Sequence, residues 1–332
     1  MKKVLSISVA AYNLEKLIRK NLDSFVNSSV RDKIEVIVTD DESKDRTAEI
    51  VQEYVDKYPG TVKLIKQKNA GPGSTVNSGI KHATGKYFKM VDGDDWVITE
   101  NLPQIINSLE QNDADMIITN YQVYDGSIDK VIETVKYNIP SDKVFVFNDY
   151  SKKLYLAMHS TMFKTSILQK NKIELDNCFY TDTEYLLLPI KYIKTFMYIN
   201  LELYVYLVGQ SGQSVSITSM QKNIKMHDKV LTRLIRFYEE NKNDLPYNNN
   251  IFLKNRIAIM ASNQLNTYLT YNDYKNMKKT IKEFNENLRL KSKDIYDTYK
   301  KNKKARIIIC SNYYFTKIIS KIYLNKIKKM RY

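Results

Sequence analysis

The chain has 332 residues, of which 43% are hydrophobic, so it can bury a core, and its composition argues against global disorder. Its formal net charge is +15. Most of that excess lies in residues 291–332, which hold thirteen Lys or Arg residues against two acids. The length fits one large domain with an appendage, or two domains.

The sequence predicts a protein of the cytoplasm. Its two cysteines, Cys178 and Cys310, are too far apart to suggest a disulfide framework or a metal site. The segment Met1–Ser6 is not followed by the long apolar region of a leader, and no stretch has the roughly 20 apolar residues of a membrane span.

Strands and helices are predicted to alternate in the first hundred residues. Apolar runs predict strands, and apolar residues at helical spacing predict the helices between them. The strands are expected at 4–10, 34–38, 62–65 and 87–91, and the helices at 14–25, 45–55 and 75–82. This order is typical of an α/β fold with a mostly parallel sheet flanked by helices.

Polar clusters follow four of these segments: Tyr12 and Asn13, Asp40 and Asp41, Gly71, and Asp92 to Asp95. In a parallel sheet with right-handed crossovers, the carboxyl ends of the strands share one edge. Open α/β sheets bind ligands at that edge. We therefore expect the four clusters to converge.

The cluster Asp92-Gly93-Asp94-Asp95 ends an apolar strand. Asp92 and Asp94 alternate along the chain, so both can reach one hard cation, and Gly93 leaves room for a close approach. Mg²⁺ or Mn²⁺ held by one or two carboxylates completes its shell with water and substrate phosphates. Lys89, just before the cluster, is interpreted as a phosphate contact or as a solvated surface residue.

The second part of the chain is predicted less regularly. A helix is expected at 103–109 and strands at 115–120 and 196–208, with hairpins or an insertion at 121–150. The polar loop 209–216, with Gln213 and Ser214, suits a lid over a diphosphate or a plain linker. From 218 onward the periodicity is helical.

These motifs resemble the ordered signature of family 2 glycosyltransferases, which are inverting enzymes of the GT-A fold. The resemblance rests on Val9–Asn13, Asp40–Thr47, Asn69–Gly79 and Val91–Asp95. Three residues depart from the family pattern: Ala11 replaces a proline, Glu42 a glycine and Val76 an arginine.

The resemblance implies a UDP-sugar donor and a divalent cation. It assigns the uracil N3–H and the ribose to Asp41, with Asp40 sharing that task, and the metal to Asp94 and Asp92. The other residues that it places around the nucleotide are Ala11, Tyr12, Asn13, Asn69, Gly71, Asn77 and Gly93.

The resemblance also indicates the residue that removes the acceptor's proton. In this family an acidic pair at a helix start after a Phe/Tyr-rich segment supplies the catalytic base. Here Thr181-Asp182 replaces the usual Glu-Asp, so Asp182 matches the position of the base. An inverting displacement needs one such base opposite the leaving group. Glu184 is the reserve candidate, and Asp95 and His159 are secondary site candidates.

The expected domains are a GT-A catalytic domain at 1–217, a helical domain at 218–302 and a basic amphipathic helix at 303–332. Within the first, residues 1–100 would bind the nucleotide and 101–217 the acceptor. The terminal helix combines Ile, Phe and Tyr with Lys and Arg, as in helices that lie on anionic membranes. It would either place the protein on the inner face of the cell membrane or pack on the protein.

The leading hypothesis is a transferase that moves a sugar to a glycan or lipid-linked acceptor in cell-surface polysaccharide synthesis. A sugar-phosphate nucleotidyltransferase is the alternative, but it would carry a basic Gly-rich loop where this chain has Tyr12-Asn13-Leu14. A nucleic-acid-binding protein is a third class, and the acidic rim argues against it because it repels phosphate. The oligomeric state is left open.

Overall fold

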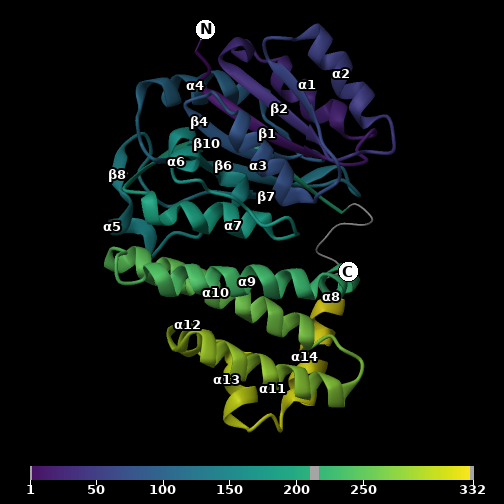
Figure 1. The fold of residues 1–332 in the computed structure, drawn as a ribbon, viewed down its shortest axis with the longest axis vertical. Helices are drawn as coiled ribbons and strands as arrows, with labels where there is room; N and C mark the ends of the chain where they lie inside the picture. The colour runs from purple at the N-terminus through teal and green to yellow at the C-terminus, as the bar shows by residue number, and fades with distance from the viewer. Residues whose placement is uncertain (1, 210–216, 330–332) are drawn as a thin grey trace. The chain divides into compact units, whose positions relative to one another are not determined.

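A computed structural model describes residues 2–209 and 217–329 (Figure 1). The chain divides into two compact units. The first comprises Met1–Tyr150 and Leu154–Ser211, and the second comprises Ser151–Lys153 and Gly212–Tyr332. In the part that is described, no helix combines the length and the apolar character needed to cross a membrane.

The first four strands of the first unit are parallel, as the sequence predicts. They are β1 (Leu5–Ala11), β2 (Ile34–Asp40), β3 (Val62–Lys66) and β4 (Tyr87–Asp92), in the spatial order β3-β2-β1-β4. Every residue of β2 is buried, as expected for a strand with both faces covered.

Helices connect these strands: α1 (Ile18–Val26), α2 (Thr47–Lys57) and α3 (Pro72–His82) (Figure 1). Helix α3 packs on β1 and β2, and α2 packs on β3. Helix α3 begins three residues earlier than predicted, because Pro72 suits the first helical position and Gly71 precedes it with φ +91°.

The remainder of the ten-stranded sheet is mixed rather than parallel. Strand β9 (Thr161–Lys164) runs antiparallel between β4 and β6 (Met116–Asp125), and β6 pairs in parallel with β10 (Thr195–Val208). The other strands are β5 (Trp96–Val97), β7 (Lys130–Val135) and β8 (Val144–Val146). The first unit also contains helices α4 (Leu102–Gln111), α5 (Phe147–Ser151), α6 (Thr165–Lys170) and α7 (Thr181–Leu187).

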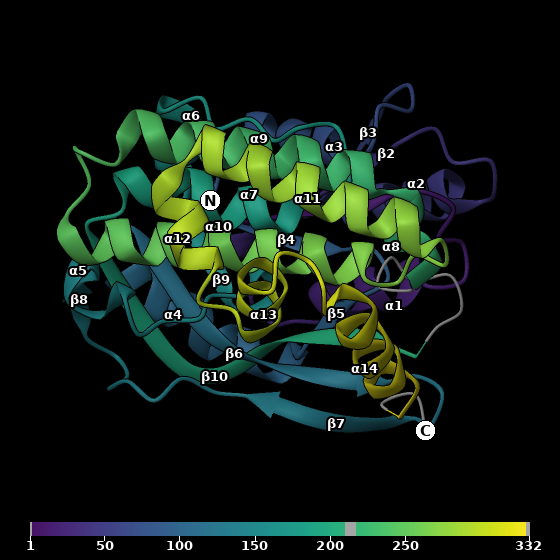
Figure 2. The same ribbon diagram turned by 90° about the horizontal axis from the view of Figure 1, so that it is seen from below.

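The second unit is helical in its described part (Figure 2). Its elements are α8 (Ile217–Lys222), α9 (Ile224–Asn241), α10 (Tyr247–Tyr268), α11 (Tyr274–Lys291), α12 (Lys293–Tyr299), α13 (Lys303–Cys310) and α14 (Thr316–Lys329). Helix α10 packs against α9, α11 and α12.

The predicted single helix at 303–332 is wrong, since two helices, α13 and α14, occupy its described part. Asn312 and Tyr313 adopt left-handed backbone angles (φ 48° and 64°) between them. Tyr313 is only 9% exposed, and its hydroxyl accepts a hydrogen bond from Asn285 of α11. Burial of this ring accompanies the break in the helix.

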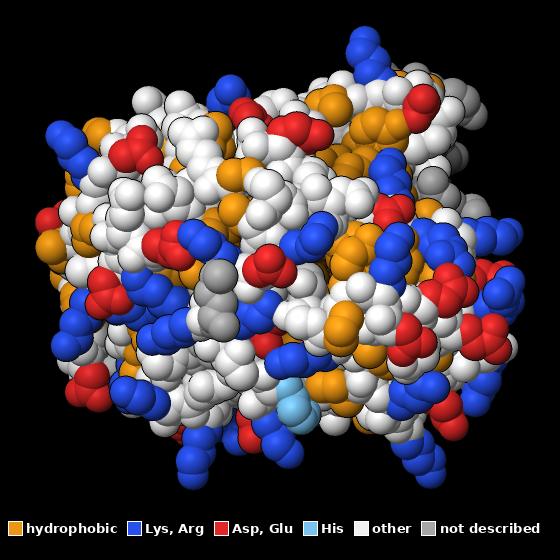
Figure 3. Space-filling model, turned by 90° about the horizontal axis from the view of Figure 1, so that it is seen from above, with side chains coloured by type: hydrophobic (Ala, Val, Ile, Leu, Met, Phe, Trp, Pro, Cys, Tyr) orange, Lys and Arg blue, Asp and Glu red, His pale blue; other side chains and the backbone are white. Residues whose placement is uncertain are grey.

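Basic and acidic side chains are interspersed on the face shown in Figure 3. Apolar side chains come to the surface there in a few small groups. This face therefore carries no continuous field of one sign.

Candidate active site

The register of the sheet brings the predicted motifs together at one edge. Ala10 of β1 lies opposite Asp92 of β4, and Ala11 lies opposite Asp40 of β2. The segments that follow these three strands therefore begin side by side, as the sequence predicts for parallel strands.

Hydrogen bonds join the loop after β1 to the loop after β2. The Asn13 amide donates to Ser43 Oγ (3.0 Å), and the Lys44 amide donates to Asn13 Oδ1 (2.8 Å). Glu42, at one of the positions where the chain departs from the family pattern, has φ 65°, a left-handed conformation that glycine adopts more easily. Tyr12 stays 48% exposed at this rim.

Asp41 closes the loop that follows β3. Its carboxylate accepts hydrogen bonds from the Ala70 and Gly71 amides (3.0 and 2.9 Å) and from Gln67 Nε2 (2.8 Å). Asn69 Nδ2 donates to the Asp41 carbonyl (3.0 Å). The carboxylate that is expected to contact the uracil edge is therefore also the group that fixes the loop after β3.

Asp40 differs from Asp41. It is 3% exposed, and its Oδ2 accepts from the Ser43 amide (3.3 Å). Among the described residues, no group donates to its buried Oδ1. A buried acceptor without a donor is costly, so Asp40 is a candidate for ligand contact.

The start of α3 lies directly against the segment before α7. A Cβ on Gly73 would lie 1.9 Å from the Asp176 carbonyl oxygen, and one on Gly71 would lie 3.2 Å from that of Asn177. Asn77 Nδ2 donates to the Leu175 carbonyl (2.9 Å), and Asn77 Oδ1 accepts from the Leu175 amide (2.8 Å). These contacts assign Asn77 to positioning the segment that leads to α7.

Three carboxylates gather at the end of β4. Oxygen atoms of Asp92, Asp94 and Asp95 lie within 4.8 Å of one another. Gly93 separates them, and a Cβ there would lie 2.7 Å from the Ala10 carbonyl oxygen and 2.4 Å from Leu14 Cδ1. Only glycine allows this tight path of the backbone.

The donor set fits a hard divalent cation. Among the described residues, the Asp94 carboxylate is hydrogen-bonded by its own backbone amide, and it and the Asp92 carboxylate each present an oxygen toward the shared point of the cluster. Asp95 is 1% exposed and is already engaged, by the Leu207 amide (2.8 Å to Oδ1) and the Tyr204 hydroxyl (to Oδ2). Asp95 therefore anchors the cluster to β10 through these two hydrogen bonds.

The cluster is electrostatically strained without a cation. Burial, followed by the charges of Asp94 and Asp182, raises the pKa of Asp92 to about 7. Burial also raises the pKa of Asp94, and burial with its two acidic neighbours raises that of Asp95 well above its usual range. A bound cation would remove this repulsion.

The structure separates the two candidates for the catalytic base. Asp182 is exposed in the first turn of α7, close enough to the acid cluster for its charge to raise the pKa of Asp92. Glu184 is fully buried and accepts a hydrogen bond from the Asp176 amide (2.7 Å). Tyr180 precedes the helix with a left-handed backbone (φ 74°), a strain that often marks functional sites.

An aromatic wall lies beside the cluster, and of its residues the sequence predicted only His159 as a site candidate. We define it as Tyr121, His159, Tyr204 and Tyr206, whose rings have centroids 4.4 to 5.1 Å from that of His159. Burial, and then the charges of Asp95, Asp92, Asp94 and Asp182, raises the pKa of Tyr206 to about 12. The Tyr206 hydroxyl therefore keeps its proton at neutral pH. It lies near enough to Asp182 and to the acids of the cluster to be influenced by their charges.

Lys89 is neither a surface residue nor on the rim. It is fully buried in β4, and its Nζ donates to the His159 carbonyl (2.8 Å). Burial, followed by the charge of Lys89, lowers the pKa of His159 to about 3, so its ring is neutral. Gln213 and Ser214 lie outside the described residues.

The helix-flanked mixed sheet, with an Asp-x-Asp cluster at the end of β4, has the GT-A-type fold of the solved structures described below. The chain belongs to glycosyl transferase family 2, whose sequence model matches residues 6–171. Family membership identifies it as an enzyme of the glycosyltransferase class.

Several curated relatives share part of the sequence. The chain is 28% identical over 218 residues to a poly(ribitol-phosphate) beta-glucosyltransferase of Bacillus spizizenii, an alignment that covers 64% of this chain and 33% of that protein. It is 32% identical over 152 residues to the putative glycosyltransferase EpsH of Bacillus subtilis, covering 46% and 41%. The chain thus spans about a third to two fifths of the length of these relatives.

Solved structures share the fold. A crystal structure of S. aureus TarS 1–349 in complex with UDP-GlcNAc superimposes with a TM-score of 0.65 at 18% identity, covering 94% of this chain and 93% of that one. A mannosyltransferase of Pyrobaculum calidifontis in complex with GDP-Man and Mn²⁺ gives a TM-score of 0.50 at 14% identity, covering 97% and 87%.

Proposed function

We propose that this chain transfers a sugar from a UDP-sugar to a hydroxyl group of a glycan or lipid-linked acceptor, with inversion at the anomeric carbon. The observation that carries the proposal is the Asp92–Asp94 pair at the end of β4 in a family 2 chain, with the exposed Asp182 near enough for its charge to act on Asp92. The fold shared with TarS, whose crystal structure contains UDP-GlcNAc, supports a UDP-sugar as the donor.

In the proposed reaction, Asp182 takes the proton of the acceptor hydroxyl as its oxygen attacks the anomeric carbon. The bond from that carbon to the diphosphate breaks, and UDP leaves on the opposite face. Asp92 and Asp94 would hold Mn²⁺ or Mg²⁺, which neutralises the charge of the leaving diphosphate. Asp40 and Asp41 would contact the nucleoside, with Ala11, Tyr12, Asn13, Asn69 and Gly71 around it.

The acceptor is proposed to belong to cell-surface polymer synthesis. Relatives named for poly(ribitol-phosphate) glycosylation, including TarS of S. aureus at 27% identity over 169 residues, support this class of acceptor. For the domains, we propose residues 1–217 as the catalytic part, with 1–100 for the nucleotide and 101–217 for the acceptor, and 218–302 as a helical domain.

Two variants test the assignment of the site. Asp94→Ala should lose cation-dependent UDP binding, because a ligand oxygen is removed.

Asp182→Asn should keep UDP binding while transfer falls by about 10²- to 10⁴-fold, because the base is lost. Glu184→Gln tests the reserve candidate for the base. Calorimetry with UDP and Mn²⁺, together with a UDP-release assay, separates binding from transfer; normal transfer by Asp182→Asn would refute the base assignment.

We further propose that α14 lies on the anionic inner surface of the cell membrane. Its inward face carries Thr316 and Ser320, which are 0% and 5% exposed, and Ser320 Oγ donates to the Leu269 carbonyl (2.6 Å). Its outward face carries Ile318 and Ile322, which are 52% and 60% exposed. Exposed Phe315, Lys317 and Lys321 flank them.

A helix that buries small polar groups and exposes isoleucines beside lysines matches the chemistry of a lipid surface. The double variant Ile318→Asn/Ile322→Asn should lose sedimentation with vesicles that contain phosphatidylglycerol. Leu290→Asn is the control, because Leu290 is 84% exposed on α11. Equal sedimentation of the double variant and the control would refute the membrane contact.

A further inference from the structure

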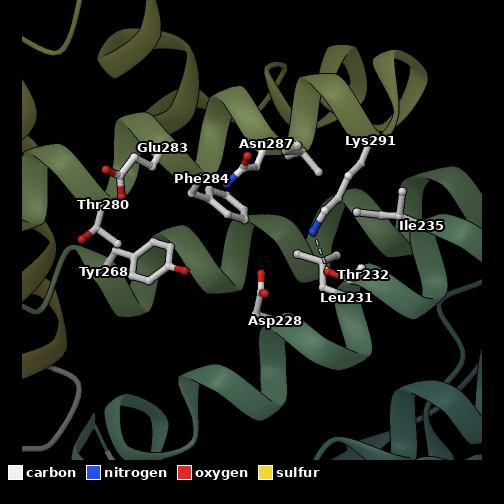
Figure 4. Close-up of a pocket in the computed structure, with 11 residues that line it drawn as sticks. Asp228, Leu231, Thr232, Ile235, Tyr268, Thr280, Glu283, Phe284, Asn287 and Lys291 are labelled. Carbon is white, nitrogen blue, oxygen red and sulfur yellow. Dashed lines mark hydrogen bonds between the residues drawn. The ribbon is translucent and has the colours of Figure 1, made fainter.

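A cavity of about 190 Å³ lies among helices α9, α10 and α11 of the second unit (Figure 4). Its floor is apolar, formed by Leu231, Ile235, Phe284 and Leu288. Its rim is polar, formed by Asp228, Thr232, Tyr268, Thr280, Glu283, Asn287 and Lys291. In Figure 4 the Asp228 carboxylate and the Tyr268 hydroxyl point into the same space below Phe284.

A buried hydrogen-bond relay fixes two of these groups. Gln264 is fully buried, and its Nε2 donates to Tyr268 OH (2.7 Å) and to Asp228 Oδ1 (3.2 Å). Its Oε1 accepts from Nδ1 of His227 (2.6 Å), which is 5% exposed. A relay of this kind holds the donor and acceptor in place before any ligand arrives.

The relay leaves the Tyr268 hydroxyl with a proton to donate. Its oxygen accepts from Gln264, and among the described residues no acceptor takes its own hydrogen. Burial raises the pKa of Tyr268 to about 12, so the group is a donor at neutral pH. Asp228 keeps Oδ2 as an acceptor on the same side of the cavity.

The other end of the cavity also offers both kinds of hydrogen bond. Lys291 Nζ donates to Thr232 Oγ1 (2.8 Å), and an ammonium has further donors to offer. Exposed Asn287 and Glu283 add an amide and a carboxylate. The Phe284 ring, 5.5 Å from that of Tyr268, supplies an apolar face between the two ends.

Alternating donors and acceptors around an aromatic ring match a sugar, whose hydroxyls do both and whose C–H face is apolar. The volume is below the range of about 300–1,000 Å³ for drug-sized ligands and equals roughly six water volumes, which is the scale of one ring. Two carboxylates against one lysine disfavour a phosphate group. We propose that this cavity binds one neutral sugar unit of the acceptor glycan, apart from the residues that perform transfer.

The inference rests on the proposed function for its glycan. The probes are glucose, galactose and N-acetylglucosamine, added to the full chain and followed by saturation-transfer NMR. Asn287→Trp fills the cavity from an exposed position, and Leu290→Trp adds the same indole to the same helix outside the cavity. We expect Asn287→Trp to reduce the signal about tenfold and Leu290→Trp to leave it unchanged.

A second measurement separates this site from the site of transfer. With the Asp94→Ala variant, sugar binding in the cavity should persist although cation-dependent UDP binding is lost. Binding of a sugar without any UDP binding by the native chain would refute the proposed function and support the cavity. No signal with any of the three sugars, or equal signals from Asn287→Trp and Leu290→Trp, would overturn the inference.

Discussion

At the scale of single residues, the three acids at the end of β4 repel one another, but among the described residues only the carboxylate of Asp95 is hydrogen-bonded to β10. Asp95 is held by Tyr204 and Leu207, whereas Asp92 and Asp94 present their oxygens to a ligand. Strand β10 pairs with β5 just after the cluster and brings the Tyr204 hydroxyl and the Leu207 amide to the Asp95 carboxylate, whereas Tyr204 meets Asp92 only at its backbone amide (3.2 Å). Asp95 thus positions the cluster, and Asp92 and Asp94 are left to bind a cation.

The raised pKa of Asp92 predicts how cation binding depends on pH. Its folded-state value of about 7 exceeds that of an unfolded aspartate, about 3.9, so the folded state binds an extra proton between these values. Stability of the cation-free protein should therefore fall as pH rises from about 4 to 7. Mn²⁺ requires the ionised carboxylate and should raise the melting temperature more at pH 8 than at pH 5.5.

Differential scanning fluorimetry with and without Mn²⁺ at the two pH values measures this effect. The Asp94→Ala variant is the control, since it retains Asp92 but lacks the partner ligand. An equal or larger Mn²⁺ effect at pH 5.5 would show that ionisation of Asp92 does not limit binding.

Some residues of the site could be predicted from the sequence, and others could not. The acids at the strand ends were predictable, because periodicity located the strands and parallel pairing fixed the shared edge. Asn77 was predicted beside the nucleotide, but both atoms of its amide pair with Leu175, 98 residues away. Tyr204 and Tyr206 looked like ordinary strand residues, since nothing local distinguishes a phenol beside an acid cluster.

At the scale of elements, one buried glutamate ties the first four strands together. Glu35 of β2 is fully buried and accepts from Ser6 of β1 (2.6 Å), Lys63 of β3 (2.7 Å) and the Thr84 amide before β4 (2.6 Å). Burial alone would raise its pKa, but these hydrogen bonds prevail and lower it to about 2.

Glu35 should therefore stabilise the first unit. Because its folded pKa lies below that of an unfolded glutamate, the stabilisation is present above about pH 4.3 and is lost as pH falls through about 2. Glu35→Gln should lower the free energy of unfolding by roughly 2–3 kcal/mol at neutral pH.

Urea unfolding followed by fluorescence of Trp96, the single tryptophan, reports on this unit. Glu53→Gln is a matched control, since Glu53 pairs with Arg19 at the surface with 49% of its side chain exposed. A loss for Glu35→Gln no larger than that for Glu53→Gln would contradict the role given to Glu35.

Helices and strands were predicted well where the hydrophobic periodicity was regular. They were predicted less well where contacts distant in sequence determine the structure. The alternating strands and helices of the first hundred residues follow from local patterns. The mixed pairing of β9 with β4 and β6 depends on contacts distant in sequence. The helix break before α14 accompanies a hydrogen bond between Tyr313 and Asn285 of α11, a contact distant in sequence that helical periodicity does not reveal.

At the scale of the whole molecule, the chain joins a family 2 unit to a helical unit without a recognised catalytic motif. The fold class and the enzyme class were predictable because the motifs of the first unit occur in a fixed order. The polar cavity among α9, α10 and α11 was not predictable, because helical periodicity reports which residues face inward but not which polar groups meet.

The central claim is a cation-dependent UDP site at Asp92 and Asp94, and the melting temperature of the full chain tests it most directly. UDP, GDP, CDP and ADP would each be added with and without Mn²⁺, since binding to the native state raises stability by mass action. The account predicts a rise with UDP that requires Mn²⁺ and is absent in Asp94→Ala. A rise with UDP that is equal without Mn²⁺, or no rise with UDP at all, would contradict it.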